Sequence, residues 1–158
     1  MGRAVPDRVL IACGLAWGAA LIHVQAAIEH IDEYPLFAIF FAILAPAQLA
    51  WGTALYRSRS RRLLTLGAAA SIGIVALWIA SRTTGLPIGP TPWIPEPVGI
   101  EDSIASADEL LLALVVVAHL HGASHGVFAR GWRYAADAAS LGLILLSSLS
   151  FLVIGHAH

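Results

Sequence analysis

The chain has 158 residues, of which 58% are hydrophobic and only 12% are charged. Soluble domains carry about 25% charged residues, so this composition excludes an ordinary soluble domain and predicts an integral membrane protein in the lipid bilayer. The net charge of -1 and the absence of a long basic run exclude a nucleic-acid-binding surface.

Apolar segments along the chain predict an all-α fold, an integral membrane bundle of five transmembrane helices. A helix needs about 20 apolar residues to cross a bilayer, so residues 1–158 have room for one bundle and no separate soluble domain. We expect the spans at residues 9–28, 35–56, 63–80, 104–127 and 134–154.

The first two spans each contain a notable polar residue. His23 lies in the first span, and residues 24–26 resemble a signal-peptidase site, so a cleaved signal peptide is an alternative to a retained helix. In the second span Pro46 predicts a kink. We expect the side chain of Gln48 to bond with backbone carbonyls that this proline leaves free.

The longest connection covers residues 81–102 and holds five prolines and three glycines. This composition forbids a helix and favours a stiff, extended path. Long loops in compact proteins are often lids or binding loops, so the connection either covers a site or lies on the headgroup layer as a plain connector.

The arginines predict the orientation of the bundle. With five spans, eight of the nine arginines fall on one side and only Arg82 falls on the other. The positive-inside rule therefore places the N-terminus in the cytoplasm, and the C-terminus and the proline-rich loop outside the plasma membrane. Most carboxylates fall on the outer side, as do His23 and His30.

The fourth span carries ionisable residues inside a membrane-length apolar run, with Asp108 and Glu109 near its start and three histidines toward its end. Such residues are costly in a membrane and usually mark a functional site. At about 100° per residue, Asp108 and His119 share one stripe of the helix, which should face a neighbouring helix.

Histidines and carboxylates toward the outer end predict a transition-metal site. On the first span His23 and His30 lie within about 20° of one another around the helix, and Glu33 follows one turn later if the helix continues. Imidazole and carboxylate groups are ligands for copper, zinc and related ions. The candidate ligands are His23, His30, Glu33, Asp108, Glu109 and His119.

A second, inner site is also geometrically allowed. His121 and His125 form an i, i+4 pair, and Cys13 on the first span lies at similar depth, so one thiol and two imidazoles could hold a metal ion. The alternative for each residue alone is structural. The imidazoles would then bond with helix carbonyls, and the cysteine would pack in the core.

Other cofactors and activities fit less well. A haem b bound by two histidines needs both at one height, but His119 should lie about 10 Å deeper than His23. The several histidine boxes of membrane desaturases and the paired Glu-x2-His runs of di-iron bundles are not found. No arrangement of nucleophile and base is recognisable, so an enzyme is the less favoured class.

The long connection resembles part of a known group of proteins. The motifs are the stretch from Ser81 to Pro90, the run Glu96-Pro97-Val98-Gly99 and Asp102, together with His23 and the Glu29-His30 pair. They are similar to small multi-pass membrane proteins of actinobacterial type, a group with no assigned activity. The resemblance implies only that the outer loop and the histidines of the first span belong to one unit.

The sequence therefore predicts a plasma-membrane protein that binds copper or zinc at its outer face, for metal handling, sensing or transport. A proton relay through the same residues is a variant, because histidine titrates near neutral pH. The competing class is a non-catalytic structural or assembly subunit, whose outer acids would dock a membrane-protein partner or a second copy of the chain.

Overall fold

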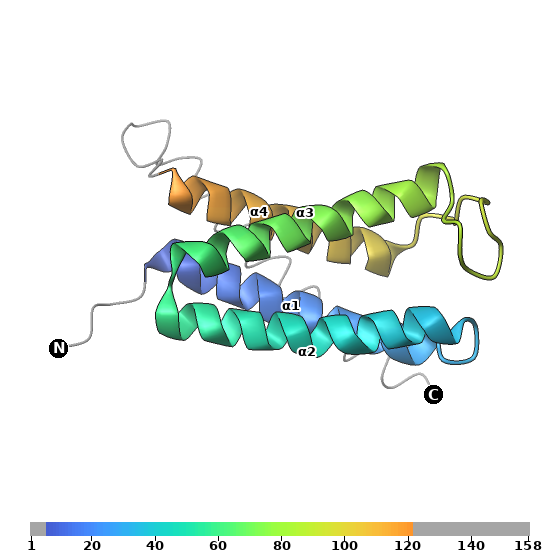
Figure 1. Ribbon diagram of the computed structural model, residues 1–158, viewed down its shortest axis with the longest axis horizontal. Coiled ribbons are helices and arrows are strands. Elements are labelled where there is room, and N and C mark those ends of the chain that lie inside the picture. Colours follow the sequence, from blue (N-terminus) through green and yellow to red (C-terminus); the bar gives the residue numbers. More distant parts are fainter. Residues whose placement is uncertain (1–5, 122–158) are drawn as a thin grey trace.

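The computed structural model describes residues 6–121, which form helices and connections with no strand (Figure 1). The helices are α1 (Asp7–Glu29), α2 (Pro35–Ser58), α3 (Arg61–Thr83) and α4 (Ile100–Leu120). All four are long and apolar enough to cross a membrane. This part of the chain therefore has the architecture of a multi-pass membrane protein, and the predicted fifth span at 134–154 lies outside the described residues.

The first three helices agree with the predicted spans to within a few residues, but the fourth differs. We predicted 104–127, whereas α4 begins at Ile100 and ends at Leu120, with His121 as its cap. Its first turn holds two carboxylates, which look too polar for a span but suit the positive end of a helix dipole. The next residue in the sequence is Gly122, and glycine is common just past a helix end.

Local signals set the other helix ends. Pro35 occupies the first turn of α2, where its missing N–H costs nothing. Arg59 ends α2 in a left-handed conformation with φ of 48°, and the hydroxyl of Ser60 caps α3 by accepting a hydrogen bond from the Leu63 amide at 3.2 Å. Because so few residues separate α2 from α3, the two helices leave this turn as antiparallel neighbours.

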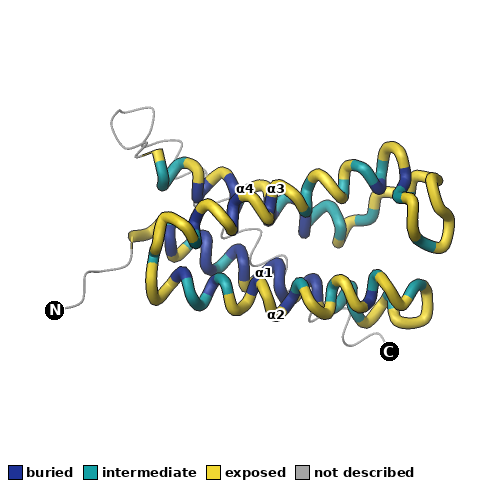
Figure 2. The backbone as a smooth tube through the Cα atoms, viewed as in Figure 1, coloured by how far each residue is buried: buried dark blue, intermediate teal, exposed yellow. Residues whose placement is uncertain are grey.

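Helix α1 lies at the centre of the packing. It packs against α2 and α4, and α3 packs against α4, whereas α2 and α3 contact each other sparingly. Figure 2 shows the buried residues concentrated along α1 and on one face of α4. Within this core the thiol of Cys13 donates to the Gly52 carbonyl of α2 at 3.2 Å, so the predicted packing role of this cysteine is confirmed.

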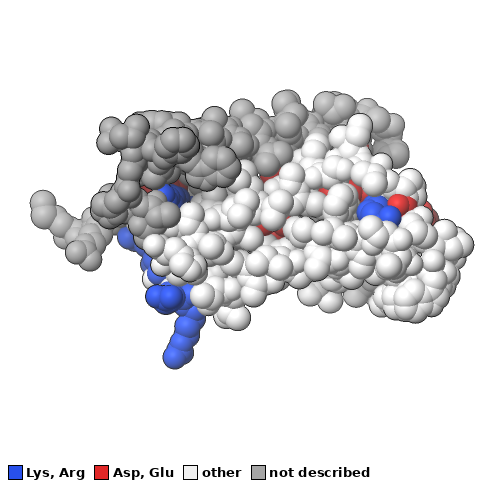
Figure 3. Space-filling model, turned by 90° about the horizontal axis from the view of Figure 1, so that it is seen from above, with Lys and Arg blue, Asp and Glu red and all other residues white. Residues whose placement is uncertain are grey.

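Charged side chains separate to the two ends of the bundle. The antiparallel order brings the starts of α1 and α3 and the ends of α2 and α4 to one end (Figure 1). Arginines gather there, as Figure 3 shows, while carboxylates of the connections gather at the opposite end. This is the separation that the sequence predicts, although the side of the membrane on which each end lies remains a prediction.

The contact between α2 and α3 depends on one tryptophan and one glycine. The indole Nε1 of Trp51 donates to the Leu63 carbonyl at 2.8 Å, and its ring lies against Gly67. A Cβ atom at Gly67 would come within 2.0 Å of the Trp51 ring. Only glycine lets the two helices approach in this way.

Replacing Gly67 by alanine should destabilise the bundle by about 1–3 kcal/mol, because the added methyl group would overlap the Trp51 ring. The control is Gly73→Ala on the same helix, where no atom lies within 4 Å of the added Cβ. It should be neutral or stabilising by up to about 1 kcal/mol. Unfolding in detergent, followed by circular dichroism, measures both, and equal losses would show that the Trp51 contact does not hold α2 against α3.

Candidate functional site

Three buried polar side chains from three helices meet in the middle of the bundle. Gln48 of α2 donates its amide Nε2 to the Oε1 atom of Glu109 on α4. The Nε2 atom of His23 on α1 lies 3.6 Å from the same oxygen. Glu109 is completely buried, His23 is 3% exposed and Gln48 is 9% exposed. One carboxylate oxygen therefore joins α1, α2 and α4.

Neighbouring residues position these side chains. His23 follows a buried stretch of α1 that includes Ala16, Ala19 and Ala20, and small residues of this kind let helices approach closely. Its imidazole stacks on the ring of Phe41 from α2, with centroids 5.5 Å apart and an angle of 21° between the planes. The stacking holds the imidazole plane and leaves its edge directed to the carboxylate.

Each of the three side chains retains a polar atom without a hydrogen-bond partner among residues 6–121. These atoms are His23 Nε2, Gln48 Oε1 and Glu109 Oε2, and all three are buried. Buried polar atoms are nearly always paired in proteins, because an unpaired one costs about 1–3 kcal/mol. Three such atoms in one cluster make it the candidate site among the described residues.

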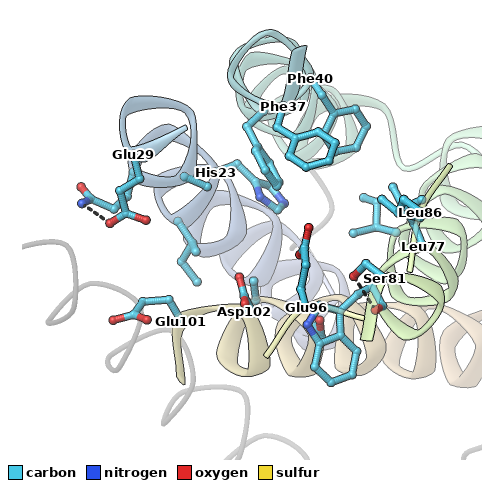
Figure 4. Close-up of a pocket in the computed structure, with 18 residues that line it drawn as sticks. His23, Glu29, Phe37, Phe40, Leu77, Ser81, Leu86, Glu96, Glu101 and Asp102 are labelled. Carbon is cyan, nitrogen blue, oxygen red and sulfur yellow. Dashed lines mark hydrogen bonds between the residues drawn. The ribbon is translucent and has the colours of Figure 1, made fainter. Parts of the chain in front are cut away.

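A cavity of about 130 Å³ is lined by His23 and extends toward the carboxylate-rich end of the bundle, whereas Gln48 and Glu109 are not among its lining residues. Figure 4 shows His23 and Glu96 directed into the same space, with Asp102 beside them. The walls also include phenylalanines of α2 and Trp78 of α3. A second cavity, of about 280 Å³, is lined by residues of the connection and shares Glu96 and Asp102 with the first, so the two cavities are neighbours.

The connection from residue 84 to 99 is fixed in place by one arginine. Arg82, near the end of α3, donates to Glu96 of the connection and to Asp102 in the first turn of α4. The Glu96 amide also donates to the Ser81 carbonyl at 3.0 Å. The connection is therefore tied to both helices that it joins, and through Glu96 it forms part of the cavity wall.

The structure does not bring the other candidate ligands of α1 to His23. The helix ends at Glu29, so the condition under which Glu33 would follow His30 by one helical turn is not met. His30 places Nδ1 2.9 Å from its own-helix carbonyl at Ala26, and its Nε2 lies 3.9 Å from Glu33. The described residues contain no group of three histidine, cysteine or acidic side chains that could hold a metal ion.

The candidate residues of α4 lie at different depths. Asp108 is completely buried beside Glu109, on the stripe predicted to face a neighbouring helix. His119 is half-buried in the last turn and lies about 15 Å along the axis from Glu109, since a helix rises 1.5 Å per residue. It therefore does not share the cluster with His23.

Of the candidates for the inner site, the structure describes Cys13 and His121, and each bonds elsewhere. Cys13 is buried and directs its thiol to α2. His121 is exposed, and its Nδ1 lies 2.9 Å from the Val117 carbonyl of its own helix, as in the structural alternative. His125 lies outside the described residues.

Gln48 is the site residue that the sequence interpretation missed. We expected it to bond with carbonyls freed by Pro46, but its amide instead donates to Glu109 across the bundle. The available signal was an amide side chain within an otherwise apolar membrane-length helix, where polar residues commonly bond to a neighbouring helix.

Comparison with known proteins found no match for this chain. No family model matches the chain, and neither the curated proteins nor the solved structures provide a similar protein. The resemblance to small actinobacterial membrane proteins therefore stays a prediction, and functional reasoning rests on the geometry of the site.

Arg82→Ala should release the connection from the ends of α3 and α4. The amide of Glu96 should then exchange with deuterium about tenfold faster or more, because charge-assisted hydrogen bonds each contribute about 1.5–3 kcal/mol. Mass spectrometry of the protein in detergent measures the exchange. The control Arg62→Ala, at an exposed site on the other end, should leave this segment unchanged; an equally slow Glu96 amide in Arg82→Ala would contradict the anchoring role.

Proposed function

We propose that this protein conducts protons across the membrane by way of a buried exchange site formed by His23, Glu109 and Gln48, which protons would reach from the carboxylate-rich end of the bundle. The observation that carries the proposal is the complete burial of the Glu109 carboxylate with the His23 imidazole 3.6 Å away. An ionisable residue inside a membrane-spanning segment is by default a functional site, and chains of acids and histidines form proton relays in pumps and transporters.

The chemistry of the three groups suits proton exchange. Histidine is the residue type that gains or loses a proton between pH 5 and 8. A proton on His23 Nε2 faces Glu109 Oε1, so a small approach of the two side chains would allow its transfer to the carboxylate. Gln48 keeps its Nε2 on the same carboxylate and would hold Glu109 in place in both protonation states.

Access to the site supports this proposal. Protons would enter where His30 and Glu33 line the outer cavity, pass Glu96 and Asp102, and reach His23 through the inner cavity. In the plasma membrane, with the arginine-rich end in the cytoplasm, this route would open to the outside. A carboxylate-lined mouth raises the local concentration of protons and other cations.

Proton movement is testable in proteoliposomes that contain a pH-sensitive dye. An imposed membrane potential should drive proton entry in the wild type, and Glu109→Gln should reduce the rate by at least about tenfold, since the amide keeps the shape but cannot take up a proton. Asp32→Asn, an exposed acid outside both cavities, should keep the wild-type rate. Wild-type rates equal to those of empty liposomes would overturn the proposal.

A transition metal is the second candidate occupant of the same site. His23 Nε2 and Glu109 Oε1, 3.6 Å apart, could both ligate one ion, because zinc lies about 2.0–2.2 Å from nitrogen and carboxylate ligands. Copper or zinc would then be handled, sensed or transported through the outer cavities. This alternative needs at least one further ligand, from water or from residues outside 6–121.

Metal content separates the two candidates. If a metal binds here, protein purified in detergent and equilibrated with zinc or copper should hold close to one ion per chain, as measured by elemental mass spectrometry. His23→Ala should lower this content by about tenfold, given that one lost ligand weakens such a site by more than about 1.4 kcal/mol. His30→Ala should keep the ion, because His30 bonds within its own turn; background metal in the wild type removes this candidate.

A further inference from the structure

An apolar cleft opens between α2 and α3, and Gln48 lines it. It has a volume of about 320 Å³ and is lined by Leu44, Ala47, Trp51, Leu66, Ala70 and Leu112, among others. Leu66 is 66% exposed at its rim, and Ala47 and Ala70 are also exposed. In a membrane-spanning bundle these residues face the bilayer, so the cleft is open to molecules dissolved in it.

Gln48 and Ser71 are the small polar residues that line this otherwise apolar cleft, and Gln48 is the one with an unpartnered buried atom. Its side chain lines the cleft and is nine-tenths buried. Because Nε2 is committed to Glu109, the atom left for a ligand is Oε1, which has no partner among the described residues. An acceptor with no donor, at the bottom of an apolar cleft, selects a ligand that supplies a hydrogen-bond donor.

We propose that this cleft binds a membrane lipid with one apolar chain and a neutral hydroxyl head, and that the hydroxyl donates to Oε1 of Gln48. The chain would lie between α2 and α3, on Trp51 and Ala70, and leave the cleft past Leu66. The proposal does not depend on proton exchange at Glu109, since it concerns the other face of the Gln48 amide.

The charge of the surroundings determines the type of head group. An ionised carboxylate or phosphate has only hydrogen-bond acceptors, so it cannot bond with Oε1 of Gln48. Its negative charge would also lie close to Glu109, so this type of head group is disfavoured. An ammonium group would have to lose its water in a cleft whose lining is almost wholly apolar, with the Gln48 amide oxygen and the Ser71 hydroxyl as neutral partners and no carboxylate in the lining. A hydroxyl loses less hydration and satisfies Oε1 with a single hydrogen bond.

Photolabelling of the full chain in lipid nanodiscs tests the proposal. The probes are a straight-chain alcohol and a branched isoprenoid alcohol of equal length, each with a diazirine in its chain, plus matched hydrocarbon and primary amine versions. Labelled positions are mapped by mass spectrometry. The two alcohols distinguish acyl from isoprenoid lipids as the source of the hydroxyl.

The variants are chosen so that loss of folding is recognisable. Ala70→Phe fills the cleft, and Ala69→Phe places the same ring at the adjacent exposed position, which does not line it. Gln48→Leu removes the acceptor and keeps an apolar side chain of similar size. Circular dichroism of each variant reports whether the helices remain.

We expect at least one alcohol to label α2 and α3 within the cleft, at least about fivefold more than its hydrocarbon or amine version. Ala70→Phe should abolish this labelling and Ala69→Phe should keep it, while Gln48→Leu should lower alcohol labelling to the hydrocarbon level. Equal labelling by alcohol and hydrocarbon, preference for the amine, or labelling that Ala70→Phe leaves intact would each overturn the proposal. Proton flux through Glu109 could still be present in all of these cases, so the two proposals fail separately.

Discussion

Burial of the Glu109 carboxylate is the constraint on which the arrangement of the helices depends. A charged group away from water is costly unless donors surround it, and the backbone N–H groups of α4 are already used within the helix. Donors have to come from other helices: the Gln48 amide of α2 donates to the carboxylate, and the His23 imidazole of α1 lies 3.6 Å from the same oxygen. This requirement fixes how α1 and α2 are rotated about their axes and which residues of each lie at the depth of Glu109.

Two arginines fasten the bundle at its opposite ends. At the arginine-rich end, Nη1 of Arg8 donates to the Ala118 carbonyl at 2.8 Å and so satisfies one of the last carbonyls of α4. At the other end, Arg82 holds the connection against α3 and α4. Both contacts involve α4, so the helix that carries Glu109 is held at its two ends as well as in its middle.

The features that the sequence could predict are those that a lipid environment imposes on the chain. A membrane helix satisfies its own backbone, so runs of apolar residues located α1, α2 and α3 closely. The expectation that an imidazole of the first span meets a carboxylate of the fourth is met by His23 and Glu109. Which face of α2 packs against the other helices could not be predicted. A helix that is apolar all round has no amphipathic pattern, so the sequence does not show where Gln48 points. The local bonding of His30 could not be predicted either, because the end of α1 at Glu29 is not marked by a distinct sequence signal.

The contact of Trp51 with Gly67 has a mechanical consequence. It lies near the turn that joins α2 to α3, and these two helices share few other contacts. From Gly67 to Ser81 the axis of α3 extends about 21 Å at 1.5 Å per residue. Tilting α3 by about 5° about that joint would displace its far end by about 2 Å while the joint itself hardly moves. A small shift at the Trp51–Gly67 contact would therefore change the width of the bundle at its carboxylate-rich end.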